Sequence, residues 1–138
     1  MIDARPVGHV IGLLLLMLGG SMALPLAADL VEGQGNWVVF FEAAVLTGLT
    51  GMCLTLACSN AVTDRLTLQQ TFLLTTSVWV ALPIFAAIPF ALGGSAETYT
   101  DAFFEAMSGL TTTGSTVLSG LEDMPAGLLL WRGMMQWF

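Results

Sequence analysis

Three long apolar stretches, separated by short polar connections, cover the first two thirds of the chain. They span residues 8–28, 37–59 and 71–92. A helix needs about 20 predominantly apolar residues to cross the hydrocarbon core of a bilayer. Each stretch therefore predicts a transmembrane helix. Pro83 and Pro89 lie in the far half of the third stretch and are expected to bend that helix.

The polar connections indicate how these helices are oriented. Arg5 precedes the first stretch, and Arg65 lies between the second and the third. Because two spans separate the arginines, both lie on one side of the membrane, which the positive-inside rule assigns to the cytoplasm. The loop expected at residues 29–36 (DLVEGQGN) then lies outside. The acidic residues expected on the outer side are Asp29, Glu32, Glu97, Glu122 and Asp123.

A cleaved signal peptide is the alternative interpretation of the first apolar stretch. Arg5 would supply its basic region, and residues 13–18 would supply its apolar core. The uncharged run, residues 6–28, is longer than the core of a normal signal peptide, and further spans follow it. These two features favour a retained transmembrane helix.

A shorter helical pattern follows the polar loop 93–100. Residues 101–110 (DAFFEAMSGL) predict a helix in which Thr100 or Asp101 caps the start and Gly109 suits the end. Its length would be about 15 Å, which is half the thickness of the hydrocarbon core. The pattern therefore predicts a re-entrant half-helix that enters from the outside and stops near the middle of the membrane.

Residues 111–116 (TTTGST) are poor helix formers and lack the bulk of core residues. We expect them to return toward the outside in extended form, before a last helix starts near Pro125 and covers residues 125–138. Extended backbone at this depth is tolerated only where protein buries it or where it lines a water-filled path. A pore loop is therefore predicted. An amphipathic surface helix followed by a Ser/Thr loop is the alternative.

The chemistry of residues 111–116 suits a cation. Gly114 can adopt dihedral angles that turn a carbonyl group inward. The negative end of the preceding helix dipole also favours a cation near its C-terminus. Potassium filters replace the hydration shell of the ion with a stack of carbonyl oxygens. The segment therefore predicts a cation, such as K⁺, bound by backbone oxygens.

The composition agrees with a membrane protein and excludes some functions. The chain is 56% hydrophobic and 9% charged, whereas soluble domains carry about 25% charged residues. Three basic residues in a chain of net charge −7 exclude nucleic acid as a partner. His9 is the only histidine, so a multi-histidine metal site is excluded. Cys53 and Cys58 lie in an apolar stretch and are expected to be buried free thiols.

Three ionisable residues are candidates for supporting the loop. Arg132 is expected inside or near the apolar zone, where a charged residue is usually functional or paired. We expect it to pair with Glu105 of the half-helix and to brace the loop from behind. Snorkelling of Arg132 to the outer headgroups is the alternative. Asp101 is expected to cap the half-helix, and the outer acidic residues are expected to be solvated. Glu42 is expected to have either a packing or a peripheral role.

The motif DAFFEAMSGLTTTGSTVLSGLEDMPAGLLLWRGMMQW, residues 101–137, resembles the first pore region of the Trk/Ktr potassium transporters, in their TrkH branch. In that family one chain holds four helix–pore loop–helix repeats around one pore, and TrkH-type members carry two extra helices ahead of the first repeat. The resemblance implies that residues 1–66 hold those two extra helices. Residues 67–138 would hold the first repeat, with a truncated second helix, which implies an N-terminal fragment of a longer chain.

The resemblance also implies site residues and partners. The filter residues would be Thr111, Thr112, Thr113, Gly114 and Ser115, with K⁺ bound at Thr112, Thr113 and Gly114. Ser115 and Thr116 stand where the TVGYG filter of potassium channels has tyrosine and glycine, which implies looser selection among alkali cations. The implied partners are the lipid bilayer, the three remaining pore repeats, a cytoplasmic nucleotide-binding regulatory subunit and a second copy in a homodimer. The implied location is the inner membrane, with a cytoplasmic N-terminus.

The sequence thus predicts an all-α membrane protein with transmembrane helices, a re-entrant pore helix and an extended filter loop. The expected function is potassium uptake, with K⁺ as the transported ion and no other cofactor. A secondary carrier with a broken helix and a small homotetrameric cation channel are the alternatives. An intramembrane hydrolase using Ser108 or Ser115 is disfavoured, because His9 lies at the opposite end of the first span.

Overall fold

The computed structural model describes residues 1–33, 35–61 and 64–138. The described residues contain helices and no strand, which confirms the predicted all-α class. Three helical segments are long and apolar enough to cross a membrane: Arg5–Glu32, Trp37–Ala57 and Leu68–Leu92. The elements are α1 (Arg5–Ser21), α2 (Ala23–Glu32), α3 (Trp37–Ala57), η1 (Ser59–Ala61), α4 (Leu68–Ala86), α5 (Ile88–Leu92), α6 (Tyr99–Leu110), η2 (Leu121–Asp123) and α7 (Ala126–Met135).

The first span is longer than the sequence pattern suggests. Helices α1 and α2 meet at Met22 and together form a rod of 28 residues. The predicted loop at residues 29–36 is therefore wrong in its first half, because Asp29 and Glu32 lie in α2. The helix continues until Gly33, whose left-handed backbone (φ 68°) ends it. Gln34 of this predicted loop, like residues 62–63 of the next connection, lies outside the described residues.

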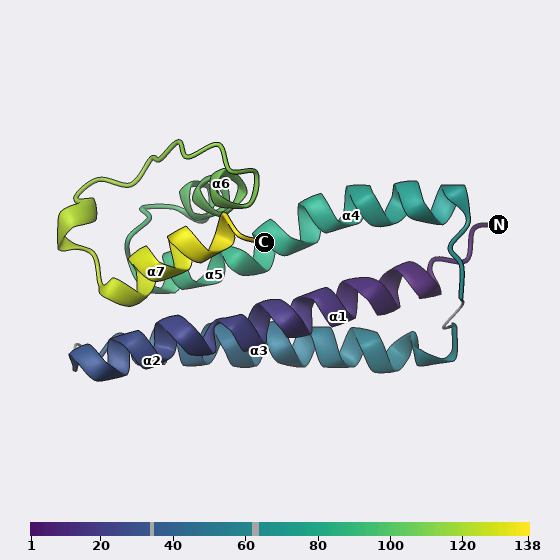
Figure 1. Ribbon diagram of the computed structural model, residues 1–138, viewed down its shortest axis with the longest axis horizontal. Coiled ribbons are helices and arrows are strands. Elements are labelled where there is room, and N and C mark those ends of the chain that lie inside the picture. The colour runs from purple at the N-terminus through teal and green to yellow at the C-terminus, as the bar shows by residue number, and fades with distance from the viewer. Residues whose placement is uncertain (34, 62–63) are drawn as a thin grey trace.

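Helices α1 and α3 lie side by side along most of their length (Figure 1). Glycines permit the close approach: a side chain added at Gly12 would strike the backbone of Gly51, and one added at Gly51 would strike the backbone of Gly12. A side chain at Gly19 would crowd Gly48 and Ala44 in the same way. The small residues of α3 therefore lie on the face that packs against α1.

The third span begins with a capping box. The Thr67 side chain accepts a hydrogen bond from the Gln70 backbone, and the Gln70 side chain accepts one from the Thr67 backbone. The Gln70 amide also donates to the Asp3 carbonyl, 2.8 Å away, which ties the N-terminal segment to the start of α4. These bonds start the helix at Leu68, three residues before the predicted position.

The third span is interrupted near its end, between α4 and α5. Pro83 lies inside α4, and Pro89 lies in the first turn of α5. Two side chains bond carbonyl groups just before the interruption at Ala87. The Tyr99 hydroxyl donates to the Ile84 carbonyl, and the Trp131 indole donates to the Ala86 carbonyl at 3.1 Å. Neighbouring elements thus satisfy backbone groups at a bend expected inside the membrane.

The last third of the chain packs against the end of this bundle that lies away from the N-terminus (Figure 1). Figure 1 shows α6 end-on while α1, α3 and α4 run across the view, so α6 is steeply inclined to the long helices. Residues 111–120 then run back toward η2, and α7 returns alongside them (Figure 1). The shared core includes Trp131 of α7, which packs edge-on against Phe40 of α3 at 6.2 Å between ring centroids.

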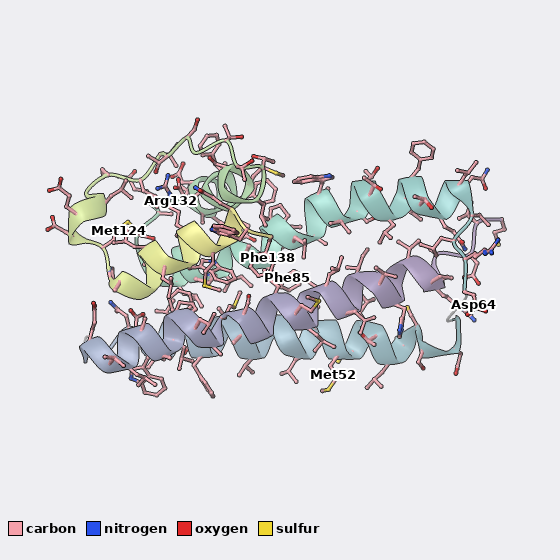
Figure 2. The ribbon with its side chains drawn as sticks, in the orientation of Figure 1. Met52, Asp64, Phe85, Met124, Arg132 and Phe138 are labelled. Carbon is pink, nitrogen blue, oxygen red and sulfur yellow. The ribbon has the colours of Figure 1, made fainter. Side chains whose placement is uncertain are left out.

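The outer faces of the long helices carry large apolar side chains. Figure 2 shows Met52 of α3 pointing away from the other helices. Cys53 is exposed and Cys58 half-buried, so the expectation that both thiols are buried is wrong. The face of α3 that carries Met52 and Cys53 is the one turned away from α1. Other exposed apolar residues of α3 and α4 are Phe41, Leu46, Leu49, Phe72 and Trp79.

Candidate ion-filter segment and its support

The start of α6 differs from the predicted one. The helix begins at Tyr99, and Thr98 is its cap instead of Thr100 or Asp101. Asp101 contributes from the third helical position, where its carboxylate accepts hydrogen bonds from the backbone and the hydroxyl of Thr98. Partial burial raises the pKa of the Tyr99 hydroxyl, which donates a hydrogen bond to the Ile84 carbonyl of α4.

The end of α6 has the hydrogen bonds of a Schellman motif. The Thr112 backbone N–H donates to the Gly109 carbonyl, and the Thr113 N–H donates to the Ser108 carbonyl, each at 3.0 Å. This motif requires a left-handed residue at the first position after the cap, which is usually glycine. Here that residue is Thr112, with φ of 56°, so the prediction that Gly109 ends the helix is wrong: Gly109 lies inside α6. The helix therefore ends by placing a β-branched residue in a disfavoured conformation.

Beyond Thr112 the backbone is neither helix nor strand through Leu118. Gly114 has φ of 78°, a left-handed conformation that favours glycine. A side chain added there would meet no atom of the described residues within 4 Å. Residues 111–117 are exposed, and the buried Leu118 fastens the segment to the core. One face of residues 113–117 is therefore open.

Hydrogen bonds hold the opposite face of this segment against α6. The Ser108 hydroxyl donates to the Ser115 carbonyl at 2.6 Å, and the hydroxyls of Thr111 and Thr113 lie 2.7 Å apart. The Arg132 guanidinium makes a long contact, 3.4 Å, with the Gly114 carbonyl. Among the described residues, no donor lies against the carbonyl oxygens of Thr112 and Thr113. These two oxygens can therefore accept a ligand.

The ion pair expected between Glu105 and Arg132 is present. The Arg132 Nε lies 2.5 Å from Glu105 Oε1, and the Glu105 side chain is fully buried. The second carboxylate oxygen accepts hydrogen bonds from the Thr116 hydroxyl at 3.0 Å and the Val117 N–H at 3.3 Å. Figure 2 shows Arg132 extending from α7. One buried carboxylate thus joins α6, α7 and the segment after Gly114.

Sequence reasoning missed a second buried carboxylate. Asp29 of α2, expected in an outer loop, is fully buried. Its Oδ1 accepts a hydrogen bond from the Gly127 N–H in the first turn of α7, 2.7 Å away. A signal for this contact existed, because no Ser, Thr, Asp or Asn stands at the start of α7. A helix without a cap of its own needs a partner from elsewhere when its start is buried.

The remaining polar candidates lie at the periphery. Glu97, Glu122 and Asp123 are exposed, as is Glu42 on α3. Glu97 and Asp101 line a small polar pocket together with Ser95 and Ser119. The His9 ring lies 3.2 Å from the Thr55 carbonyl, at the end of α1 that is remote from α6.

No family model matches the chain. It is 38% identical over 132 residues to the Trk system potassium uptake protein TrkI of Halomonas elongata, covering 96% of this chain and 27% of that protein. It is 34% identical over 135 residues to TrkH of Escherichia coli K12, covering 97% of this chain and 28% of that protein. These relatives are named as potassium uptake proteins and not as enzymes, which agrees with the sequence-based argument against a hydrolase.

A solved structure agrees with these sequence relatives. The crystal structure of the potassium transporter TrkH from Vibrio parahaemolyticus has a TM-score of 0.91 and 30% identity, over 99% of this chain and 29% of that one. The sequence relatives and the structural neighbour therefore match the same, nearly complete, length of this chain. The chain is thus similar to the TrkH-type Trk potassium uptake proteins along nearly all of its own length, and it spans somewhat more than a quarter of theirs.

Proposed function

We propose that this chain supplies one filter segment of a potassium uptake pore. The filter would consist of residues 111–116, with K⁺ losing its hydration shell to backbone oxygens. The observation that carries the proposal is the pair of Thr112 and Thr113 carbonyl oxygens, which lie on an exposed segment and have no donor within the described part of the chain. A carbonyl oxygen without a donor is the ligand that a dehydrated alkali cation requires.

The support behind the segment fits this role. A filter must hold its oxygens in place when the ion leaves, otherwise the backbone would relax toward other donors. The Ser108 hydroxyl and the Glu105 carboxylate hold Ser115, Thr116 and Val117 from the side opposite to the open face. Preorganised oxygens need no rearrangement when the ion enters. In this proposal α6 is the pore helix and its C-terminal dipole adds to the attraction.

The remaining expectations belong to the same proposal. Residues 1–66 would form two helices ahead of the pore repeat, and residues 67–138 would form the repeat itself. Three further repeats would complete the filter. A nucleotide-binding regulatory subunit on the cytoplasmic side and a second copy of the chain are the proposed partners. The proposed location is the inner membrane.

The proposed orientation has the N-terminus in the cytoplasm. Arg5 belongs to the N-terminal segment, and Arg65 belongs to the connection from α3 to α4. These two segments lie at the same end of the bundle (Figure 1). This arrangement supports the orientation, because basic residues accumulate on the cytoplasmic side. The open segment after α6 would then face the outer half of the membrane.

Potassium-limited growth of cells that express the complete protein tests the proposal. We expect Gly114→Asp to abolish growth rescue, because the added carboxylate requires an unfavourable φ and projects from the filter backbone. Gly120→Asp is the matched control. Gly120 also has positive φ, 69°, and open space around it, but it lies beyond the filter. Equal rescue by both variants at equal membrane abundance would contradict the proposal.

A further inference from the structure

Helix α7 begins without a side-chain cap from its own sequence. Pro125 occupies the cap position and provides no capping side chain. The cap comes instead from Asp29 of α2, whose Oδ1 lies 2.7 Å from the Gly127 nitrogen. A carboxylate at a helix N-terminus also interacts favourably with the helix dipole. Two helices that are distant in the sequence are therefore joined by one charge-assisted hydrogen bond.

The two residues fit each other closely. A side chain added at Gly127 would overlap the carboxylate atoms of Asp29. Only glycine therefore lets the carboxylate approach this turn. Asp29 is fully buried, and its second oxygen, Oδ2, has no partner among the described residues. Its hydrogen bond to α7 is thus the interaction that compensates for burying the carboxyl group.

The helix that Asp29 caps also carries the brace of the filter segment. Arg132 lies on α7, five residues after Gly127, and pairs with Glu105. Glu105 in turn accepts the hydrogen bonds from Thr116 and Val117. Two sets of polar contacts, joined by α7 itself, therefore connect α2 to the backbone beyond Gly114. A shift of the start of α7 would be transmitted to Arg132, since a helix moves as a rigid unit.

We propose that Asp29 is a positioning residue for ion selection: it fixes the start of α7, and through Arg132 and Glu105 it fixes the filter segment. This inference rests on the proposed function of residues 111–116. It assigns to α2, which lies outside the pore repeat, an effect on which ion passes. A residue that only stabilises the fold would change the amount of protein but not its ion preference.

The test is potassium uptake by cells expressing the complete protein, measured with competing Na⁺ and normalised to membrane abundance. We expect Asp29→Ala to lower the preference for K⁺ over Na⁺ roughly tenfold, the order expected for one lost charge-assisted hydrogen bond. Asp29→Asn keeps an oxygen that can accept from Gly127 and should retain most of the preference. Glu32→Ala removes an exposed acidic residue of the same helix and should leave the preference for K⁺ over Na⁺ unchanged.

A second pair of variants keeps the proposal testable if Asp29→Ala does not accumulate. Asp29→Ser retains polarity but is too short to reach Gly127, and Gly127→Ala displaces the carboxylate. Both should lower the preference for K⁺. The double variant Asp29→Ser/Arg132→Gln should lose no more of the preference for K⁺ than Arg132→Gln alone, because both residues act through one series of contacts. Unchanged ion preference in Asp29→Ala or Asp29→Ser, or additive losses in the double variant, would overturn the proposal.

The two proposals can fail separately. If Gly114→Asp transports as well as the wild type, the filter assignment fails and the Asp29 proposal fails with it. If Gly114→Asp abolishes uptake while Asp29→Ala reduces only the amount of protein, Asp29 is a structural residue and the filter assignment stands.

Discussion

Thr112 carries the one left-handed backbone among the non-glycine residues that the structure describes. Left-handed geometry costs a residue with a Cβ atom about 1–2 kcal/mol, and β-branching makes it less favourable still. Glycine would satisfy the same Schellman motif without this cost. The carbonyl of Thr112 is also one of the open oxygens of the proposed filter segment. Strain of this kind concentrates at functional sites, where the surroundings enforce it.

We expect Thr112→Gly to raise the free energy of unfolding of the complete protein by about 1 kcal/mol, because it relieves the strain of the left-handed backbone. The same change should weaken potassium uptake, since a glycine no longer restricts the filter backbone. Thr111→Gly is the matched control. Thr111 has φ of −85°, so glycine there should lower stability by a similar amount. Thermal unfolding of the purified variants measures both effects, and a lower stability for Thr112→Gly would contradict this account.

At the scale of elements, the three spanning helices could be predicted from their length and apolarity. A bilayer requires about 20 apolar residues per spanning helix, whatever the tertiary structure. The helix ends were less predictable. Thr98 and Asp101 form a capping box that places the start of α6 two residues early, yet Thr100 and Asp101 looked equally suitable as caps. Asp29 was misplaced because its burial depends on Gly127, 98 positions away.

The contact between α6 and α7 depends on the Glu105–Arg132 pair. Glu105→Gln leaves Arg132 without its charge partner, and Arg132→Gln leaves a buried carboxylate uncompensated. Removing one partner of a buried pair typically costs about 3–5 kcal/mol, and the 21% exposure of Arg132 places this pair toward the lower value. Each variant should therefore lower potassium uptake strongly.

A double-mutant cycle on potassium uptake measures the coupling of this pair. We expect the double variant Glu105→Gln/Arg132→Gln to lose no more potassium uptake than the worse of the two single variants. Glu122→Gln, which neutralises an exposed acid in η2, is the control and should behave as wild type. Additive losses would mean that the two residues act independently, and the proposal that their ion pair supports the segment would then be wrong.

At the scale of the whole molecule, the structure combines a lipid-facing bundle with one open polar edge. The outer faces of α3 and α4 carry large apolar side chains, as a membrane protein requires (Figure 2). Residues 111–116 form an exposed polar segment next to the core. The inclination of α6 across the bundle could not be predicted from the sequence, because helix length gives no tilt. The packing of α6 against α4 and α7 determines it.

The central claim is that a partly dehydrated alkali cation binds the backbone oxygens of residues 111–116. The most direct measurement is anomalous X-ray scattering from crystals of the complete protein soaked in rubidium, a heavier substitute for potassium. We predict a peak within coordinating distance of the Thr112 and Thr113 carbonyl oxygens, weakened or absent in Gly114→Asp crystals. Strong rubidium peaks elsewhere, with none beside these oxygens in the wild-type protein, would contradict the account.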